Sequence, residues 1–196
     1  MFLGVSENFY HLYDNLLFDY SFNSLCLVLG VSFIVTIIGV TTAWLVTFFN
    51  FSGKKVFQWA LILPLAVPPY LLAYVFTEFF DYSGTANNFL RNLLNAESDI
   101  VFSPNIRTIY GAIAVFSFTL YPYVYMVVRV AFMNISPSLI EASKLLGRNS
   151  ISTFFNLLIP LIRPAIIAGI ALVAMETLSD FGAVQHFAIP TFTTGI

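Results

Sequence analysis

Long apolar stretches, separated by short groups of charged residues, organise this chain. Each stretch is close to the roughly 20 residues that cross the hydrocarbon core of a bilayer as a helix. Lys54 and Lys55 follow the first stretch, and Glu78 follows the second. The pattern predicts four transmembrane helices, at about residues 25–49, 56–77, 108–128 and 160–179. We therefore expect an all-α, polytopic integral membrane protein.

Two of the predicted spans depart from a plain apolar helix. The second contains Pro64, Pro68 and Pro69. Because proline removes a backbone donor and clashes with the preceding turn, this span is predicted to be kinked or broken. The fourth holds Arg163 and ends at Asp180. The two charges are roughly 26 Å apart along a helix, so each could reach a different membrane interface.

Composition excludes several classes of protein. Of 196 residues, 59% are apolar and 9% charged, against about 25% charged in soluble domains, so a soluble globule is excluded. A net charge of -2 without a basic run argues against nucleic-acid binding. Cys26 is the single cysteine, so no intramolecular disulfide can form. His11 and His186 have no partner at ligand spacing, and no metal site is expected.

The distribution of charge predicts an orientation. With four spans, six of the eight basic residues lie on one side, which the positive-inside rule makes cytoplasmic. The N-terminus and the loop at 81–106, which is expected to hold a short amphipathic helix at about 86–94, then face outward with seven of the ten acidic residues. The six basic residues are Lys54, Lys55, Arg129, Lys144, Arg148 and Arg163, and the seven acids are Glu7, Asp14, Asp19, Glu78, Asp81, Glu97 and Asp99.

The cytoplasmic segment at 133–158 is predicted to form two short helices outside the membrane. Ser138 and Glu141 have the spacing of a capping box, with Pro137 before them, and Gly147 suits a left-handed helix end. A second helix at about 152–158 would run into Pro160. From the local pattern alone, a helix pair at the membrane surface is an equally good interpretation.

This segment resembles the EAA loop of permeases of binding-protein-dependent ABC importers. Ser143 stands where the family usually has a second alanine, and Ile159 where leucine is common. The resemblance implies a MetI-like permease fold, and a loop that docks into a cytoplasmic ABC ATPase dimer as the coupling helix. The matching residues are Glu141, Ala142, Ser143, Gly147, Leu157, Ile159, Pro160, Leu161 and Pro164, of which Glu141, Ala142, Ser143, Gly147 and Pro160 would be the ATPase-coupling residues.

Residues 63–74, 176–184 and 191–196 are similar to segments of ferric-iron permeases of this superfamily. The resemblance implies passage of ferric iron from a periplasmic binding protein across the bacterial inner membrane. It also implies a second permease half or subunit as a partner of this chain. Permeases for thiamine, sulfate or polyamines share the layout and remain alternatives, as does a non-transporting membrane scaffold. Because the chain ends in TFTTGI, we expect residues 1–196 to be a truncated permease domain, part of the N-terminal half of a longer protein.

The chain is expected to have neither an energy source nor catalytic chemistry of its own. It has no G-x-x-x-x-G-K-[ST] motif, so ATP would be bound by the partner ATPase, and no cofactor is expected in this chain. The sequence contains no pair of a nucleophile and a base of the kind that would indicate an enzyme. The interiors of the first three predicted spans lack the ionisable groups that ion-coupled transport would need. Backbone carbonyls at the proline-broken span could still bind sodium.

Several residues are candidates for the translocation pathway. Glu176 and Asp180 are four residues apart and would share a helix face. Carboxylates suit a hard cation such as ferric iron, although a simple position in the outer interfacial region is the favoured interpretation. Pro64, Pro68 and Pro69 are candidates for a gate. The three tyrosines Tyr121, Tyr123 and Tyr125 are interpreted as an interface belt. Ala165 and Gly169 form a pair of small residues that could let two helices approach closely, and a lipid-facing position explains them equally well.

Overall fold

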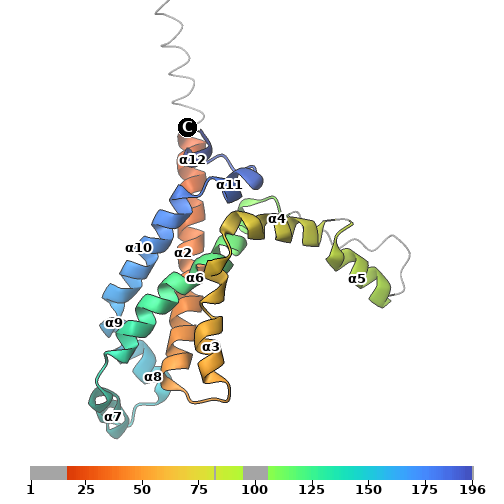
Figure 1. The fold of residues 1–196 in the computed structure, drawn as a ribbon. Coiled ribbons are helices and arrows are strands. Elements are labelled where there is room, and N and C mark those ends of the chain that lie inside the picture. The colour runs from red at the N-terminus through yellow and green to blue at the C-terminus, as the bar shows by residue number, and fades with distance from the viewer. Residues whose placement is uncertain (1–16, 82, 95–105, 196) are drawn as a thin grey trace, which may run out of the picture. The chain divides into compact units, whose positions relative to one another are not determined.

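A computed structural model describes residues 17–81, 83–94 and 106–195, whose regular structure is helical, with no strand among them. Two helices are long and apolar enough to cross a membrane, α2 (Leu17–Phe48) and α6 (Ile109–Met133); the number rises to four if each of two bent helix pairs is one span. The other elements (Figure 1) are α3 (Lys54–Ala60), η2 (Leu63–Ala66), α4 (Pro69–Phe80), α5 (Thr85–Leu94), α7 (Pro137–Leu145), α8 (Ser150–Thr153), η3 (Phe154–Leu158), α9 (Ile159–Leu161), α10 (Arg163–Ser179), α11 (Gly182–His186) and α12 (Phe192–Gly195).

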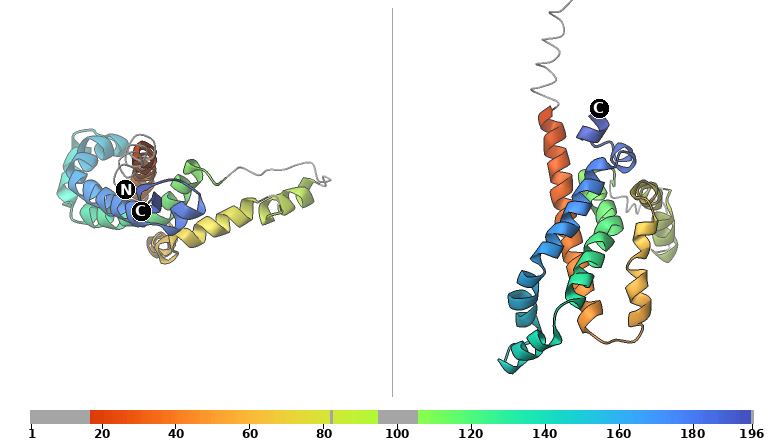
Figure 2. Two further views of the ribbon diagram at one scale, coloured as in Figure 1. Left: turned by 90° about the horizontal axis from the view of Figure 1, so that it is seen from above. Right: turned by 60° about the vertical axis from the view of Figure 1, so that its left-hand side comes forward.

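The described residues divide into two compact units. Unit 1 contains residues 17–31, 67–116 and 176–195, and unit 2 contains 32–66 and 117–175. Helices α2, α6 and α10 contribute residues to both units. The predicted amphipathic helix at 86–94 is confirmed as α5, which follows α4 after a short turn in unit 1 (Figure 2).

Unit 2 is built where α2 and α10 pack closely on α6. Val124 of α6 lies between two glycines: a Cβ added at Gly39 would be 2.8 Å from the Val124 Cβ, and one added at Gly169 would be 3.0 Å from its Cα. Small residues allow helix backbones to approach in this way. The expected close approach at Gly169 is therefore confirmed.

The interpretation of the tyrosines as an interface belt is wrong for Tyr121 and Tyr125. Tyr125 is 0% exposed and Tyr121 7% exposed, both inside unit 2. The Tyr125 hydroxyl donates to the carbonyl oxygen of Gln58 at 3.3 Å. Gln58 is in the last turn of α3, where carbonyl groups lack a helical partner. A buried tyrosine can satisfy such a group while its ring fills the core.

The predicted break in the second span is confirmed. Helix α3 ends at Ala60, Pro64 lies in the 3-10 turn η2, and α4 begins only at Pro69. Pro68 is the residue before α4, with φ -59° and ψ 142°. Proline fits the first helical position, because the N–H it lacks has no partner there.

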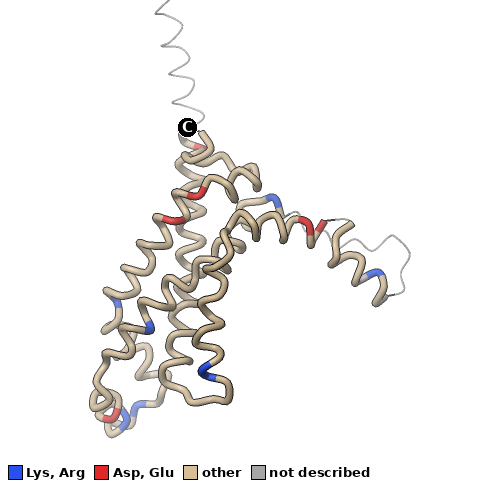
Figure 3. Tube along the Cα trace, in the orientation of Figure 1, with Lys and Arg blue, Asp and Glu red and all other residues tan. Residues whose placement is uncertain are grey.

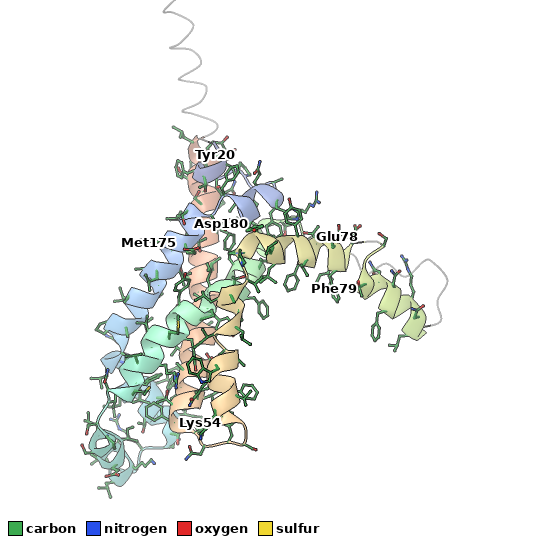
Figure 4. The ribbon with its side chains drawn as sticks, in the orientation of Figure 1. Tyr20, Lys54, Glu78, Phe79, Met175 and Asp180 are labelled. Atoms are coloured by element: carbon green, nitrogen blue, oxygen red, sulfur yellow. The ribbon has the colours of Figure 1, made fainter. Side chains whose placement is uncertain are left out.

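In unit 1, the last described residues are attached to the start of α2. The Asn23 Nδ2 donates to the Pro190 carbonyl at 3.0 Å, and the Phe192 N–H donates to Ser24 Oγ at 3.3 Å. Gly195 of α12 lies against the ring of Tyr20, which is labelled in Figure 4. Leu27 of α2 and Val184 and Phe187 near α11 supply buried apolar side chains of this unit.

Candidate functional site in the loop at residues 133–158

The predicted capping box is wrong, because α7 begins two residues earlier than that motif requires. Pro137 is the first helical residue and Ser136 is the N-cap, without a side-chain capping bond. Ser136 Oγ and Ser138 Oγ instead hydrogen-bond to each other at 2.7 Å. The fixed φ of proline suits the first helical position. Glu141 is thus the fifth residue of α7, too far along to bond back to the N-cap.

The predicted helix end at Gly147 is confirmed. Its φ is +76°, in the left-handed region. The Arg148 N–H donates to the Ser143 carbonyl at 3.1 Å and the Gly147 N–H to the Lys144 carbonyl at 2.9 Å, the bonds of a Schellman motif. A Cβ at this position would meet no atom within 4 Å, so backbone conformation, and not space, favours glycine here.

A buried hydrogen bond joins α7 to α8. Ser143 Oγ and Thr153 Oγ1 are 2.7 Å apart, and both residues are buried. Asn149 caps α8, because its Oδ1 accepts from the Ser152 N–H at 2.7 Å. Thr153 was not among the predicted site residues, since nothing in the local pattern pairs it with a residue ten positions away. The serine that replaces the family's usual alanine therefore has a structural partner.

The π-helix η3 precedes Pro160, and the Ile159 N–H bonds to the carbonyl of Phe154. Pro160 itself is exposed. Because proline has no N–H and clashes with the turn before it, a locally wider turn is a reasonable accommodation. The ring of Phe154 packs on Trp44 of α2 at 4.4 Å between centroids. This contact holds the segment that leads to Pro160 against α2.

The outer surface of this loop combines apolar and charged side chains. Leu145 is 89% and Leu146 80% exposed. Glu141, Ala142, Lys144 and Arg148 are also exposed. In unit 2 the charged residues gather at this loop and at the turn between α2 and α3, with two further basic positions on α6 and α10 (Figure 3). Exposed leucines among charges are typical of a protein-binding surface.

The candidate pathway residues fall in both units. Pro64 belongs to unit 2, and Pro68, Pro69, Glu176 and Asp180 belong to unit 1. Glu176 is exposed in the last turn of α10, and its carbonyl accepts from the Asp180 N–H at 3.1 Å.

Asp180, just beyond α10, caps α11. Its Oδ1 accepts from the Ala183 N–H at 2.8 Å. Burial raises the pKa of the Asp180 carboxyl, and the N–H groups of Ala183 and Val184 partly oppose that rise. One of the two pathway carboxylates thus has a local structural role that spacing alone did not indicate.

His186, at the end of α11, contacts α4. Its Nε2 is 3.0 Å from Thr77 Oγ1, and its ring is 4.1 Å from that of Tyr74. Burial, together with the positive charge of Arg107, lowers the pKa of His186. Among the described residues, no group of three or more His, Cys, Asp or Glu side chains is arranged to hold a metal ion. His11 lies outside the described residues.

Comparison with known proteins identifies one family and several relatives of this chain. Residues 16–193 match the family described as "Binding-protein-dependent transport system inner membrane component". The chain is 26% identical over 174 residues to the Fe(3+)-transport system permease protein FbpB 2 of Haemophilus influenzae, covering 89% of this chain and 30% of that protein.

Two further relatives are named for other substrates. The chain is 29% identical over 152 residues to the sulfate transport system permease protein CysT of Salmonella typhimurium, covering 78% of this chain and 52% of the relative. It is 31% identical over 149 residues to the molybdenum transport system permease protein ModB of Escherichia coli, covering 76% and 62%. The chain thus spans between about a third and two thirds of the length of these relatives. It belongs to the family of inner-membrane components of binding-protein-dependent transport systems.

Proposed function

We propose that this chain acts as the transmembrane permease of an ATP-driven importer, coupled to a separate cytoplasmic ATPase through the loop at 133–158. The construction of that loop carries the proposal. The Schellman bonds at Gly147 end α7, and the buried Ser143–Thr153 bond joins α7 to α8. Glu141, Leu145 and Leu146 are exposed. A surface that is both fixed and exposed can transmit motion between two proteins.

The remaining partners follow from this role. A periplasmic binding protein would deliver the substrate on the outer side, and ATP would be bound by the ATPase dimer and not by this chain. The loop would face the cytoplasm, because six of the eight basic residues lie in the loop and in the other segments predicted on its side. A second permease half or subunit would complete the pathway.

The coupling role can be tested in the reconstituted transporter with its ATPase and binding protein. Glu141→Ala and Gly147→Pro should abolish the increase in ATP hydrolysis that the loaded binding protein produces. Proline cannot adopt the positive φ of Gly147, whereas asparagine can. Gly147→Asn should therefore retain coupling, as should Glu78→Ala, which removes an exposed glutamate outside the loop. Normal uptake by both Glu141→Ala and Gly147→Pro would contradict the proposal.

For the substrate we propose ferric iron. The iron permease FbpB 2 matches 89% of this chain, and the carboxylates of Glu176 and Asp180 are hard ligands of the kind that ferric iron prefers. The identities to the sulfate and molybdenum permeases favour an inorganic oxyanion as the second candidate. Uptake of labelled iron, sulfate and molybdate into vesicles, each with its binding protein, distinguishes the two.

Uptake of iron without uptake of sulfate or molybdate would support ferric iron as the substrate. Uptake of sulfate or molybdate without uptake of iron would show instead that the substrate is an oxyanion. Thiamine and a polyamine belong in the same assay as competing substrates. If none of these ligands stimulated ATP turnover in the complete complex, the non-transporting scaffold would be the better interpretation.

A further inference from the structure

The turn between α2 and α3 is a local concentration of positive charge. Between Tyr20 and Thr77, Lys54 and Lys55 are the only charged side chains. Unit 2 as a whole contains six basic residues and one acid, Glu141. No carboxylate near in sequence is available to neutralise the two lysines, so an external anion would find a favourable potential here.

The lysines line an open hollow at the surface. An open hollow of about 640 Å³ is lined by Asn50, Phe51, Gly53, Lys54, Lys55 and Gln58. Lys54 Nζ donates to the Thr47 carbonyl at 3.3 Å and to Asn50 Oδ1 at 3.4 Å, which orients it toward the end of α2. Gly53, with φ +85°, makes the turn that starts α3 at Lys54. Figure 4 labels Lys54 at this turn.

An apolar surface continues from this hollow along α3 and into η2. Within unit 2, α3 has no buried residue. Val56, Trp59 and Leu63 are 71%, 75% and 67% exposed. Trp59 is four residues after Lys55, so the two side chains share a helix face. The surface thus places a large apolar side chain one turn from a cation.

We propose that the hollow and α3 together form a binding site for an anionic phospholipid. The phosphate would lie at Lys54 and Lys55, and an acyl chain would follow Val56, Trp59 and Leu63. The 32-residue apolar helix α2 ends directly before this turn, which places the lysines at headgroup depth, where tryptophan is also enriched. Basic residues directly beside the cytoplasmic end of a membrane helix attract anionic headgroups. A free phosphate ion would leave the apolar face of α3 uncovered, so the charge and the apolar surface together favour a lipid.

The proposal can be tested by titrating the purified complete transporter, in neutral detergent, with dioleoyl-phosphatidylglycerol and detecting bound lipid by native mass spectrometry. Lys55→Gln should weaken binding about fivefold, and Lys54→Gln with Lys55→Gln further, given the usual contribution of one basic residue near an anionic lipid. Arg163→Gln, which removes an exposed charge of the same unit elsewhere, should leave the affinity unchanged. Trp59→Ala should weaken binding, and millimolar inorganic phosphate should not displace the lipid.

Three results would overturn the proposal. An equal loss with Arg163→Gln and Lys55→Gln would mean that overall charge, and not this site, attracts the lipid. Displacement by inorganic phosphate would indicate a site for a free anion. If Trp59→Ala bound the lipid with unchanged affinity, Trp59 would not contact the acyl chain. Because Lys54 is hydrogen-bonded to the end of α2, Lys55→Gln alone is the decisive variant if the double substitution unfolds.

Discussion

Asp180 illustrates how a single residue acquires a role from its neighbours. Its carboxylate caps α11 through the Ala183 N–H, in a half-buried position. Capping stabilises the charged form, whereas burial favours the neutral form, and burial has the larger effect on its pKa. The residue proposed for the pathway is therefore also a part of the structure of unit 1, and any variant there must separate the two roles.

The raised pKa predicts how stability depends on pH. Because the folded pKa of Asp180 lies above its ordinary value of 3.8, its contribution to stability is fully present below pH 3.8 and is lost as the pH rises through the folded value. Asp180→Asn keeps an acceptor for the Ala183 N–H but does not titrate. As the pH rises through the folded pKa of Asp180, the thermal midpoint of this variant should therefore fall less than that of the unmodified chain. Asp180→Ala should cost about 1 kcal/mol through loss of the cap.

Thermal unfolding of the purified transporter between pH 3.5 and 7 measures both effects. An Asp180→Asn variant with the same pH slope as the unmodified chain would show that another group is responsible.

At the scale of helices, a buried pair of hydroxyl groups joins α7 to α8. Neither helix exceeds nine residues, and isolated helices of that length are marginal in water. Besides packing, they are stabilised by their end structures, at Gly147 and Asn149, and by the bond between Ser143 and Thr153.

A double-mutant cycle tests this bond. Ser143→Ala should destabilise the loop by about 1–3 kcal/mol, because it leaves the Thr153 hydroxyl buried without its partner. The double variant Ser143→Ala with Thr153→Val should lose less than the sum of the single variants, because both polar groups are removed. Ser150→Ala, which removes an exposed hydroxyl at the start of α8, serves as the control. Hydrogen exchange over residues 137–158 is the measurement, and strict additivity would exclude the coupling.

At the scale of the whole molecule, the distribution of charge makes a prediction about topology. The loop at 133–158 and α5 should lie on opposite sides of the membrane, since most basic residues accompany the former. After replacement of Cys26 by alanine, a cysteine at Leu146 should react with an impermeant maleimide only from the cytoplasmic side. A cysteine at Asn92 of α5 should react only from outside. Both positions are exposed, and labelling of both from the same side would contradict the orientation.

The sequence by itself determined where the long helices lie, and it indicated the segment that we propose as the coupling loop. Apolar runs and the charges between them indicate α2 and α6, the prolines predict the break before Pro69, and Gly147 predicts the end of α7. These features depend on residues close together in the chain, so local pattern is sufficient to predict them.

Only the tertiary structure decided how those helices meet. The burial of Tyr121 and Tyr125, the position of Val124 between Gly39 and Gly169, and the bond from Ser143 to Thr153 were not visible in the sequence. The start of α7 at Pro137, where a capping box at Ser138 was expected, also emerged only there. Most of these features join residues from different helices. Their energies come from packing and from pairing of buried polar groups, which a periodic pattern along one helix does not encode.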